Sequence, residues 1–177
     1  RCRPTTRSQP VVAQAKYLGS IISREGTDAV DVEARIVAAT RAFGSLSRLV
    51  FRSRLISVRA KREAYVALVL SILLYGSECW CVTAELWAKL RAFHHRCARI
   101  MCRITMWHTR EYHITTASVL KVLSLRSVET YVCRRQLQWA GHVARMGESR
   151  LPRRFLTAWC GRPRPSRRPE VTFGATL

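Results

Sequence analysis

The chain has 177 residues, of which 48% are hydrophobic, so it can build the core of one domain and is not disordered throughout. It carries 31 lysines and arginines against 11 acidic residues, a formal net charge of +20. An excess of this size on a folding chain points to a polyanionic partner, most simply a nucleic acid. Most of the cations are arginines, which contact phosphates in a planar, bidentate way, although a GC-rich coding sequence would give the same bias.

Neither a membrane span nor a disulfide framework is indicated. The longest apolar run, Tyr65 to Tyr75, is about half of the ~20 residues that a membrane-spanning helix needs. No signal-peptide pattern follows Arg1, and a first residue other than methionine suggests a piece of a longer reading frame. The seven cysteines are irregularly spaced, which favours a reducing compartment. We therefore expect an intracellular protein, with the nucleus as a compatible compartment.

The N-terminal part predicts a hairpin followed by a helix. Residues 1–10 are polar and contain two prolines, so we expect them to be frayed. Residues 11–26 place apolar side chains around Gly19 and predict a short β-hairpin. Thr27 or Asp28 can cap the next helix, whose first turn carries acids that suit the helix dipole. Its apolar residues then recur at steps of four and three up to Val50.

The remaining elements are predicted to be helices. Ser57 can cap a second helix that Gly76 stops, and its C-terminal half is apolar nearly all round, which predicts a buried central helix. Thr83 and Ser127 can cap two further long helices. Short helices are predicted over 116–123 and 152–159.

The predicted fold is therefore mainly α, with a helical bundle behind the hairpin. We assign residues 27–110 to the bundle and residues 111–160 to a C-terminal helical extension. Residues 161–177 combine prolines with arginines and are predicted to be a disordered basic tail.

No catalytic residue or resident cofactor is predicted. Two-metal nuclease or polymerase chemistry needs clustered carboxylates, and the only aspartates, Asp28 and Asp31, are explained by capping one helix. We therefore expect no primer extension by this chain alone. Whether Cys79, Cys81 and Cys97, together with His94, bind zinc stays open, because the first two are separated by one residue instead of the usual two to four.

Basic residues gather in three clusters with tryptophan and tyrosine between them. Phosphate tracking combined with base stacking requires this mixture. A solvated helix face is the better explanation for any single arginine, but it does not explain an excess of twenty charges. The candidate nucleic-acid-binding residues are Lys16, Arg48, Arg52, Arg54, Arg59, Lys61, Arg62, Arg96, Arg99, Arg103, Arg134 and Arg135.

Four blocks resemble one family. Lys16–Gly19 (KYLG) is similar to the primer-grip hairpin of non-LTR (LINE-like) retrotransposon reverse transcriptases. Asp31–Ile36 (DVEARI) resembles the first thumb helix of that family, and Leu73–Trp80 (LLYGSECW) resembles its next signature. Arg135–Met146 (RQLQWAGHVARM), followed by RLP at 150–152, is similar to a C-terminal block of the family. Their order along residues 14 to 159 makes the resemblance fairly specific.

The resemblance implies a fragment made of the primer grip, a thumb-like bundle and the start of the C-terminal extension. Tyr17, Leu18 and Gly19 would then lie near the primer terminus, and the arginines would meet the phosphates of an RNA template, an RNA–DNA hybrid or DNA. The fingers and the Mg²⁺-binding palm of the same polyprotein would lie upstream, so the parent would be an RNA-directed DNA polymerase. The alternative is a stand-alone basic helical RNA-binding or ribosome-associated protein.

Overall fold

The structure is a computed structural model that describes residues 12–24 and 26–157. Its described part is mainly helical with one short antiparallel hairpin, which confirms the predicted fold class. The predictions for residues 1–10 and 161–177 lie outside the described residues. None of the described helices is long and apolar enough to cross a membrane.

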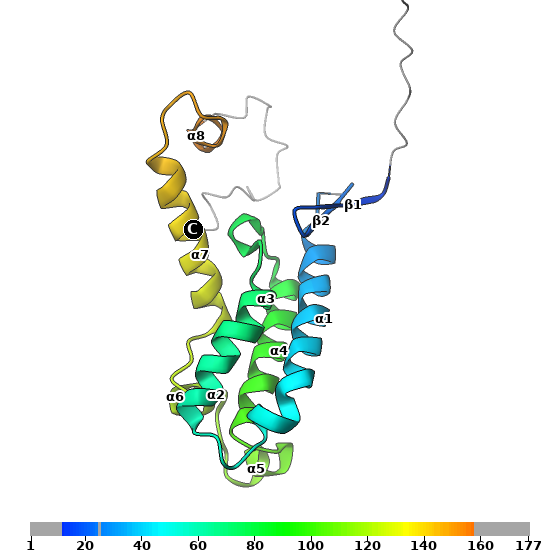
Figure 1. The fold of residues 1–177 in the computed structure, drawn as a ribbon, viewed down its shortest axis with the longest axis vertical. Coiled ribbons are helices and arrows are strands. Elements are labelled where there is room, and N and C mark those ends of the chain that lie inside the picture. Colours follow the sequence, from blue (N-terminus) through cyan, green and yellow to red (C-terminus); the bar gives the residue numbers. More distant parts are fainter. Residues whose placement is uncertain (1–11, 25, 158–177) are drawn as a thin grey trace, which may run out of the picture.

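The hairpin lies at one end of α1. Strand β1 (Gln14–Tyr17) pairs antiparallel with β2 (Ser20–Ser23), so that Tyr17 and Ser20 flank a two-residue turn. Helix α1 (Ala29–Leu46) follows and continues into the π-helical turn Ser47–Phe51. In Figure 1 the hairpin sits at the start of α1, at the opposite end of the bundle from α5.

Three long helices form the bundle. The second is continuous from Val58 to Leu73 and consists of α2 (Val58–Ala64), a π-helical middle (Tyr65–Leu70) and α3 (Ser71–Leu73). A 3₁₀ turn at Ser77–Cys79 leads into α4 (Ala84–Met101), and Figure 1 shows α1, α2–α3 and α4 running side by side.

The C-terminal helices extend this bundle. Helix α5 (Met106–Glu111) was not predicted, whereas α6 (Thr116–Val122), α7 (Val128–Ala144) and α8 (Leu151–Thr157) fall in predicted regions. The buried core continues from α4 into α6 and the first half of α7. The second half of α7 leaves the bundle and carries α8 at its far end (Figure 1).

Local capping explains most of the helix starts. Ser57 accepts a hydrogen bond from the Ala60 amide, and Thr83 and Ser127 cap α4 and α7 in the same way, as predicted. Asp28 occupies the N-cap position of α1, one of the two predicted, but its carboxylate makes no capping hydrogen bond.

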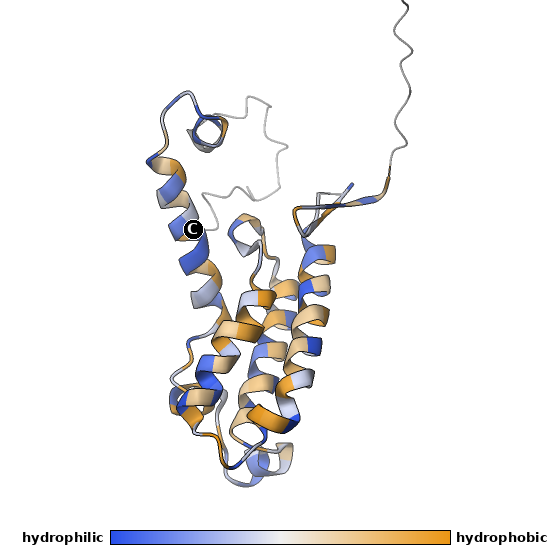
Figure 2. Cartoon of the chain, viewed as in Figure 1, coloured by the Kyte–Doolittle hydropathy of each residue, from blue (hydrophilic) through white to orange (hydrophobic). Residues whose placement is uncertain are grey.

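The core is aromatic where the three helices meet. The Phe43 and Phe51 rings stack with their centroids 4.4 Å apart, and Tyr65 packs edge-on against both. Figure 2 shows apolar residues concentrated along the bundle helices. The second helix buries Tyr65, Val69, Leu70 and Leu73, as predicted, whereas Leu68 on its outer face is 49% exposed.

Candidate nucleic-acid interface

The hairpin turn is formed by Leu18 and Gly19, which both have positive φ angles, 46° and 90°. A two-residue hairpin turn needs this left-handed backbone, which glycine adopts freely and leucine only under strain. The side chains of the tip are accessible, since Tyr17 is 64% exposed and Leu18 77%. Lys16 on the same strand is also exposed. The tip thus presents an aromatic ring and a cation to the outside.

Two residues of the bundle hold the carbonyl groups of this turn. The Tyr75 hydroxyl donates a hydrogen bond to the Leu18 carbonyl at 2.7 Å, and the Arg35 guanidinium donates to the Gly19 carbonyl. The Arg35 guanidinium also lies 4.4 Å from the centre of the Tyr75 ring, a cation–π contact. The turn is therefore fastened to both α1 and the segment after α3.

Asp31 lies at the centre of this attachment and is buried. Its Oδ1 accepts a hydrogen bond from the Ile21 amide of β2 at 2.9 Å, and its Oδ2 accepts one from the Trp80 indole at 3.0 Å. Nearby, Asp28 accepts from the Cys81 amide at 2.7 Å. The interpretation that capping fully explains the two aspartates is therefore wrong, because both carboxylates join α1 to distant segments.

The same region receives Gly76 and the middle of α7. Gly76 has a φ of 77°, and a Cβ atom there would lie 2.8 Å from the Ser20 hydroxyl, so a larger residue would push the hairpin away. Gln136 donates to the Trp80 carbonyl at 2.8 Å, and Arg135 donates to the Leu74 carbonyl at 3.0 Å. The four sequence blocks singled out above thus meet at one end of the molecule.

A second group of cations lies at the other end of α1. We call Arg48, Arg52, Arg54 and Arg103 the distal arginine cluster; all four are exposed, and among the described residues their side chains have no partner. Arg52 and Arg103 line one cavity together with Ile100, Ile104 and Thr105. Because α1 has 18 residues, this cluster and the hairpin are separated by about 27 Å.

A groove between α1 and α4 lies between the hairpin end of the bundle and the distal arginine cluster. Lys89 is paired with Glu33 and Glu85 at 2.7 and 3.1 Å, so its charge is balanced. Arg96 and Arg99 line the same groove, with the Arg96 guanidinium 6.0 Å from the centre of the Phe93 ring. The groove is therefore cationic in its Arg96–Arg99 part.

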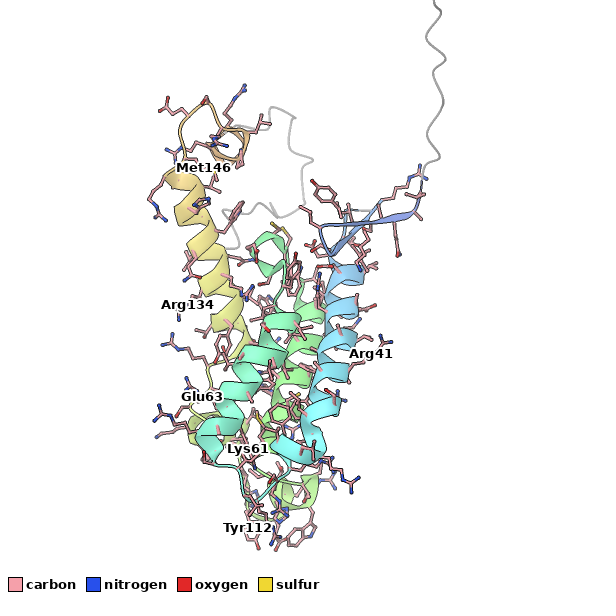
Figure 3. The ribbon with its side chains drawn as sticks, viewed as in Figure 1. Arg41, Lys61, Glu63, Tyr112, Arg134 and Met146 are labelled. Atoms are coloured by element: carbon pink, nitrogen blue, oxygen red, sulfur yellow. The ribbon has the colours of Figure 1, made fainter. Side chains whose placement is uncertain are left out.

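Several candidate residues are engaged inside the protein. Lys61 is buried and directs its ammonium to the Met101 carbonyl at 3.5 Å, so it cannot face a ligand without unfolding its site; Figure 3 shows it within the bundle. Arg62 donates to the Ser124 carbonyl, and Arg135 holds Leu74 as described. Arg59 is exposed and paired with Glu63 at 3.0 Å. Arg134 points outward from α7 (Figure 3).

The histidine and cysteine residues considered for zinc are placed separately. Among the described residues, no three His, Cys, Asp or Glu side chains come together in a way that could hold a metal ion. His94 is buried, with Nδ1 2.9 Å from the Tyr65 hydroxyl and Nε2 3.0 Å from the Arg126 carbonyl. Because a carbonyl can only accept, Nε2 donates, and in the neutral ring Nδ1 then accepts from the Tyr65 hydroxyl. Burial lowers the pKa of His94 to about 4.

Four of the described thiols have raised pKa values. Burial raises the pKa of Cys97 to about 12, and burial is also the main cause of the raised pKa of Cys79, Cys81 and Cys102. Thiols with raised pKa values are protonated near neutral pH and are poor nucleophiles.

The residues that fasten the hairpin were not assigned roles from the sequence. Arg35 and Tyr75 fall inside the blocks that were singled out, and Asp31 and Arg35 are spaced by four residues, so their proximity on one helix face was predictable. Their partners in the hairpin were not, because they lie far away along the chain.

Comparison with known proteins relates the chain to transposon sequences. It is 27% identical over 143 residues to a transposon-derived protein of Caenorhabditis elegans, a match that covers 81% of this chain and 50% of that protein. It is 27% identical over 157 residues to a protein of Drosophila melanogaster named as an RNA-directed DNA polymerase from transposon BS, covering 88% of this chain and 16% of that polymerase. No family model and no solved structure matches the chain. The chain is thus similar to transposon-encoded polymerase sequence and spans half or less of these relatives.

Proposed function

We propose that this chain is the primer-grip, thumb and first C-terminal part of a non-LTR retrotransposon reverse transcriptase, and that it holds template and primer without supplying catalytic residues. The observation that carries the proposal is the exposed Tyr17–Leu18 tip, which Tyr75 and Arg35 fasten to the end of a basic helical bundle where residues of the other blocks meet. The two transposon relatives support it. The fingers and palm, with Mg²⁺, belong in this proposal to the rest of the polyprotein.

The spacing of the surface suits an extended nucleic acid. About 27 Å separates the hairpin from the distal arginine cluster, and one base-pair step occupies about 3.4 Å, so the two ends match about eight base pairs. Phosphates would meet the distal arginine cluster, Arg96 and Arg99, and the primer end would approach the hairpin tip. The glycine in the turn lets a backbone come close. Contacts of this kind position a duplex and read no sequence.

The salt dependence of binding tests the proposed phosphate contacts. We expect the chain to bind RNA, RNA–DNA hybrid and DNA with little sequence preference, with log affinity falling by about 0.7–0.9 per phosphate for each unit of log salt. Replacing Arg52, Arg54 and Arg103 together with alanine should lower this slope by about two to three, because none of the three side chains has a partner within residues 12–24 and 26–157. Titration of a labelled RNA–DNA hybrid at several salt concentrations measures it.

A variant with the same loss of charge provides the control. Arg41, Arg126 and Arg145 are also exposed but lie outside the distal arginine cluster and the α1–α4 groove, so their replacement with alanine should change the slope by less than about one. Equal slopes in the two triple variants would show that only net charge matters and would contradict the proposal. Tyr17→Ala should leave the affinity unchanged, since an uncharged side chain releases no counterion.

A further inference from the structure

Helix α5 exposes a group of aromatic side chains. Thr105 accepts a hydrogen bond from the His108 amide and donates its own amide to the His108 ring, both at 3.3 Å, so a capping box fixes this six-residue helix. No residue of α5 is buried: Trp107 is 59% exposed and Tyr112, just beyond the helix, is 63% exposed. Figure 3 shows Tyr112 at the end of the molecule opposite the hairpin.

These rings contact one another. The Trp107 and Tyr112 rings meet edge to face with centroids 6.0 Å apart, and the His108 ring lies 5.2 Å from that of Trp107. Large aromatic side chains contribute most to stability when they are covered, so a group held together outside the core has surface available for a ligand.

Exposed arginines lie on both sides of Trp107 along the chain. Arg103 lies three residues before α5 and shares with Arg52 a cavity that reaches Thr105, the N-cap of α5, and Arg110 lies within the helix. All three are exposed and lack a side-chain partner among the described residues. Glu111 is the one acid between Arg103 and His113. The combination of rings and cations matches the two parts of a nucleotide, since bases stack on aromatic faces and arginines bind phosphates.

We propose that Trp107 and Tyr112, together with Arg52 and Arg103, form a binding site for single-stranded RNA or DNA at the α5 end of the bundle. The site stacks unpaired bases, which is possible only where base faces are not already stacked within a duplex. This inference rests on the proposed function, because it places an unpaired strand where the gripped duplex ends, on the side away from the primer terminus. The stacking site differs from the proposed phosphate contacts in its chemistry, because aromatic rings distinguish single from double strands and charges do not.

Two variants separate ring contacts from charge contacts. Trp107→Ala with Tyr112→Ala should weaken binding of a labelled uridine 12-mer by roughly ten-fold or more, since each stacked base is lost with its ring. Binding of a blunt 20-base-pair RNA–DNA hybrid should change less than two-fold. The conservative pair Trp107→Phe and Tyr112→Phe keeps an aromatic face and should retain most of the single-strand affinity. Circular dichroism should show unchanged helicity, because both side chains are exposed.

Each alternative outcome has a distinct meaning. If Trp107→Ala with Tyr112→Ala lowers the affinity for the 12-mer and for the hybrid equally, or leaves the affinity for the 12-mer unchanged, the stacking site is overturned. If Arg52→Ala with Arg103→Ala weakens both ligands while the ring variant weakens neither, the proposed function stands and this inference fails. If neither variant changes either affinity, both fail.

Discussion

Replacing Asp31 with alanine should lower the free energy of unfolding by about 3 to 5 kcal/mol. The change removes a buried carboxylate that accepts hydrogen bonds from the Ile21 amide and the Trp80 indole, and a buried donor without a partner costs about 1–3 kcal/mol. It also takes away the carboxylate that lies 3.7 Å from Arg35, which holds the hairpin turn. Urea denaturation followed by circular dichroism measures the loss.

Matched variants locate this effect. Glu33→Ala removes an exposed carboxylate of the same helix, paired with Lys89, and should cost less than about 1 kcal/mol. Asp31→Asn keeps one acceptor oxygen and should fall between the two. Amide exchange at Ile21 should accelerate in Asp31→Ala and not in Glu33→Ala. A cost below about 1 kcal/mol for Asp31→Ala, or unchanged exchange at Ile21, would show that the carboxylate does not hold the hairpin.

Acidification should destabilise the protein through His94, by an amount on the order of 3 kcal/mol between pH 6.5 and pH 4. The folded pKa of about 4 lies below the ordinary value of 6.5, because burial disfavours the charged ring. Above pH 6.5 the ring is neutral in both states and its contribution to stability is complete. Between pH 6.5 and pH 4 the unfolded state binds a proton that the folded state does not, so stability falls as the pH falls. One unit of pKa corresponds to about 1.4 kcal/mol.

The contribution of His94 is isolated by comparing variants across the same pH range. His94→Gln retains a donor and an acceptor but cannot titrate, so its unfolding free energy should depend less on pH than that of the wild type. Burial also lowers the pKa of His95, with the nearby positive charge of Arg99 as a further cause, so some dependence should remain. Identical profiles for His94→Gln and the wild type would contradict the assignment.

The helices could be predicted because their signals are local. The steps of four and three in apolar residues, and the serine or threonine caps at Ser57, Thr83 and Ser127, depend only on residues within a few positions of one another. Helix α5 was missed because it is short and buries no side chain, so it has no apolar stripe. The start of α5 nevertheless has a local signal in Thr105 and His108, whose side chains form the cap.

The candidate site was harder to predict from the sequence, because residues of the same type have different partners in the structure. Arg59, Lys61 and Arg62 stand within four positions and look alike in sequence. In the structure Arg59 pairs with Glu63, Lys61 is buried against the Met101 carbonyl, and Arg62 reaches the Ser124 carbonyl. Two of these three partners lie 40 and 62 residues away along the chain, beyond what helical spacing can reveal.

The sequence by itself determined the helical fold, the hairpin and the excess of positive charge, since local periodicity, capping and composition suffice for these. The tertiary structure alone decided which cations remain available and what the four blocks do. The Asp31 carboxylate could accept hydrogen bonds from the first amides of its own helix or from donors elsewhere in the chain. It accepts from the Ile21 amide and the Trp80 indole, because these donors would otherwise lose their partners away from water. Lys61 is buried because its ammonium pairs with the Met101 carbonyl, whereas the side chains of the distal arginine cluster have no such partner among the described residues and are exposed.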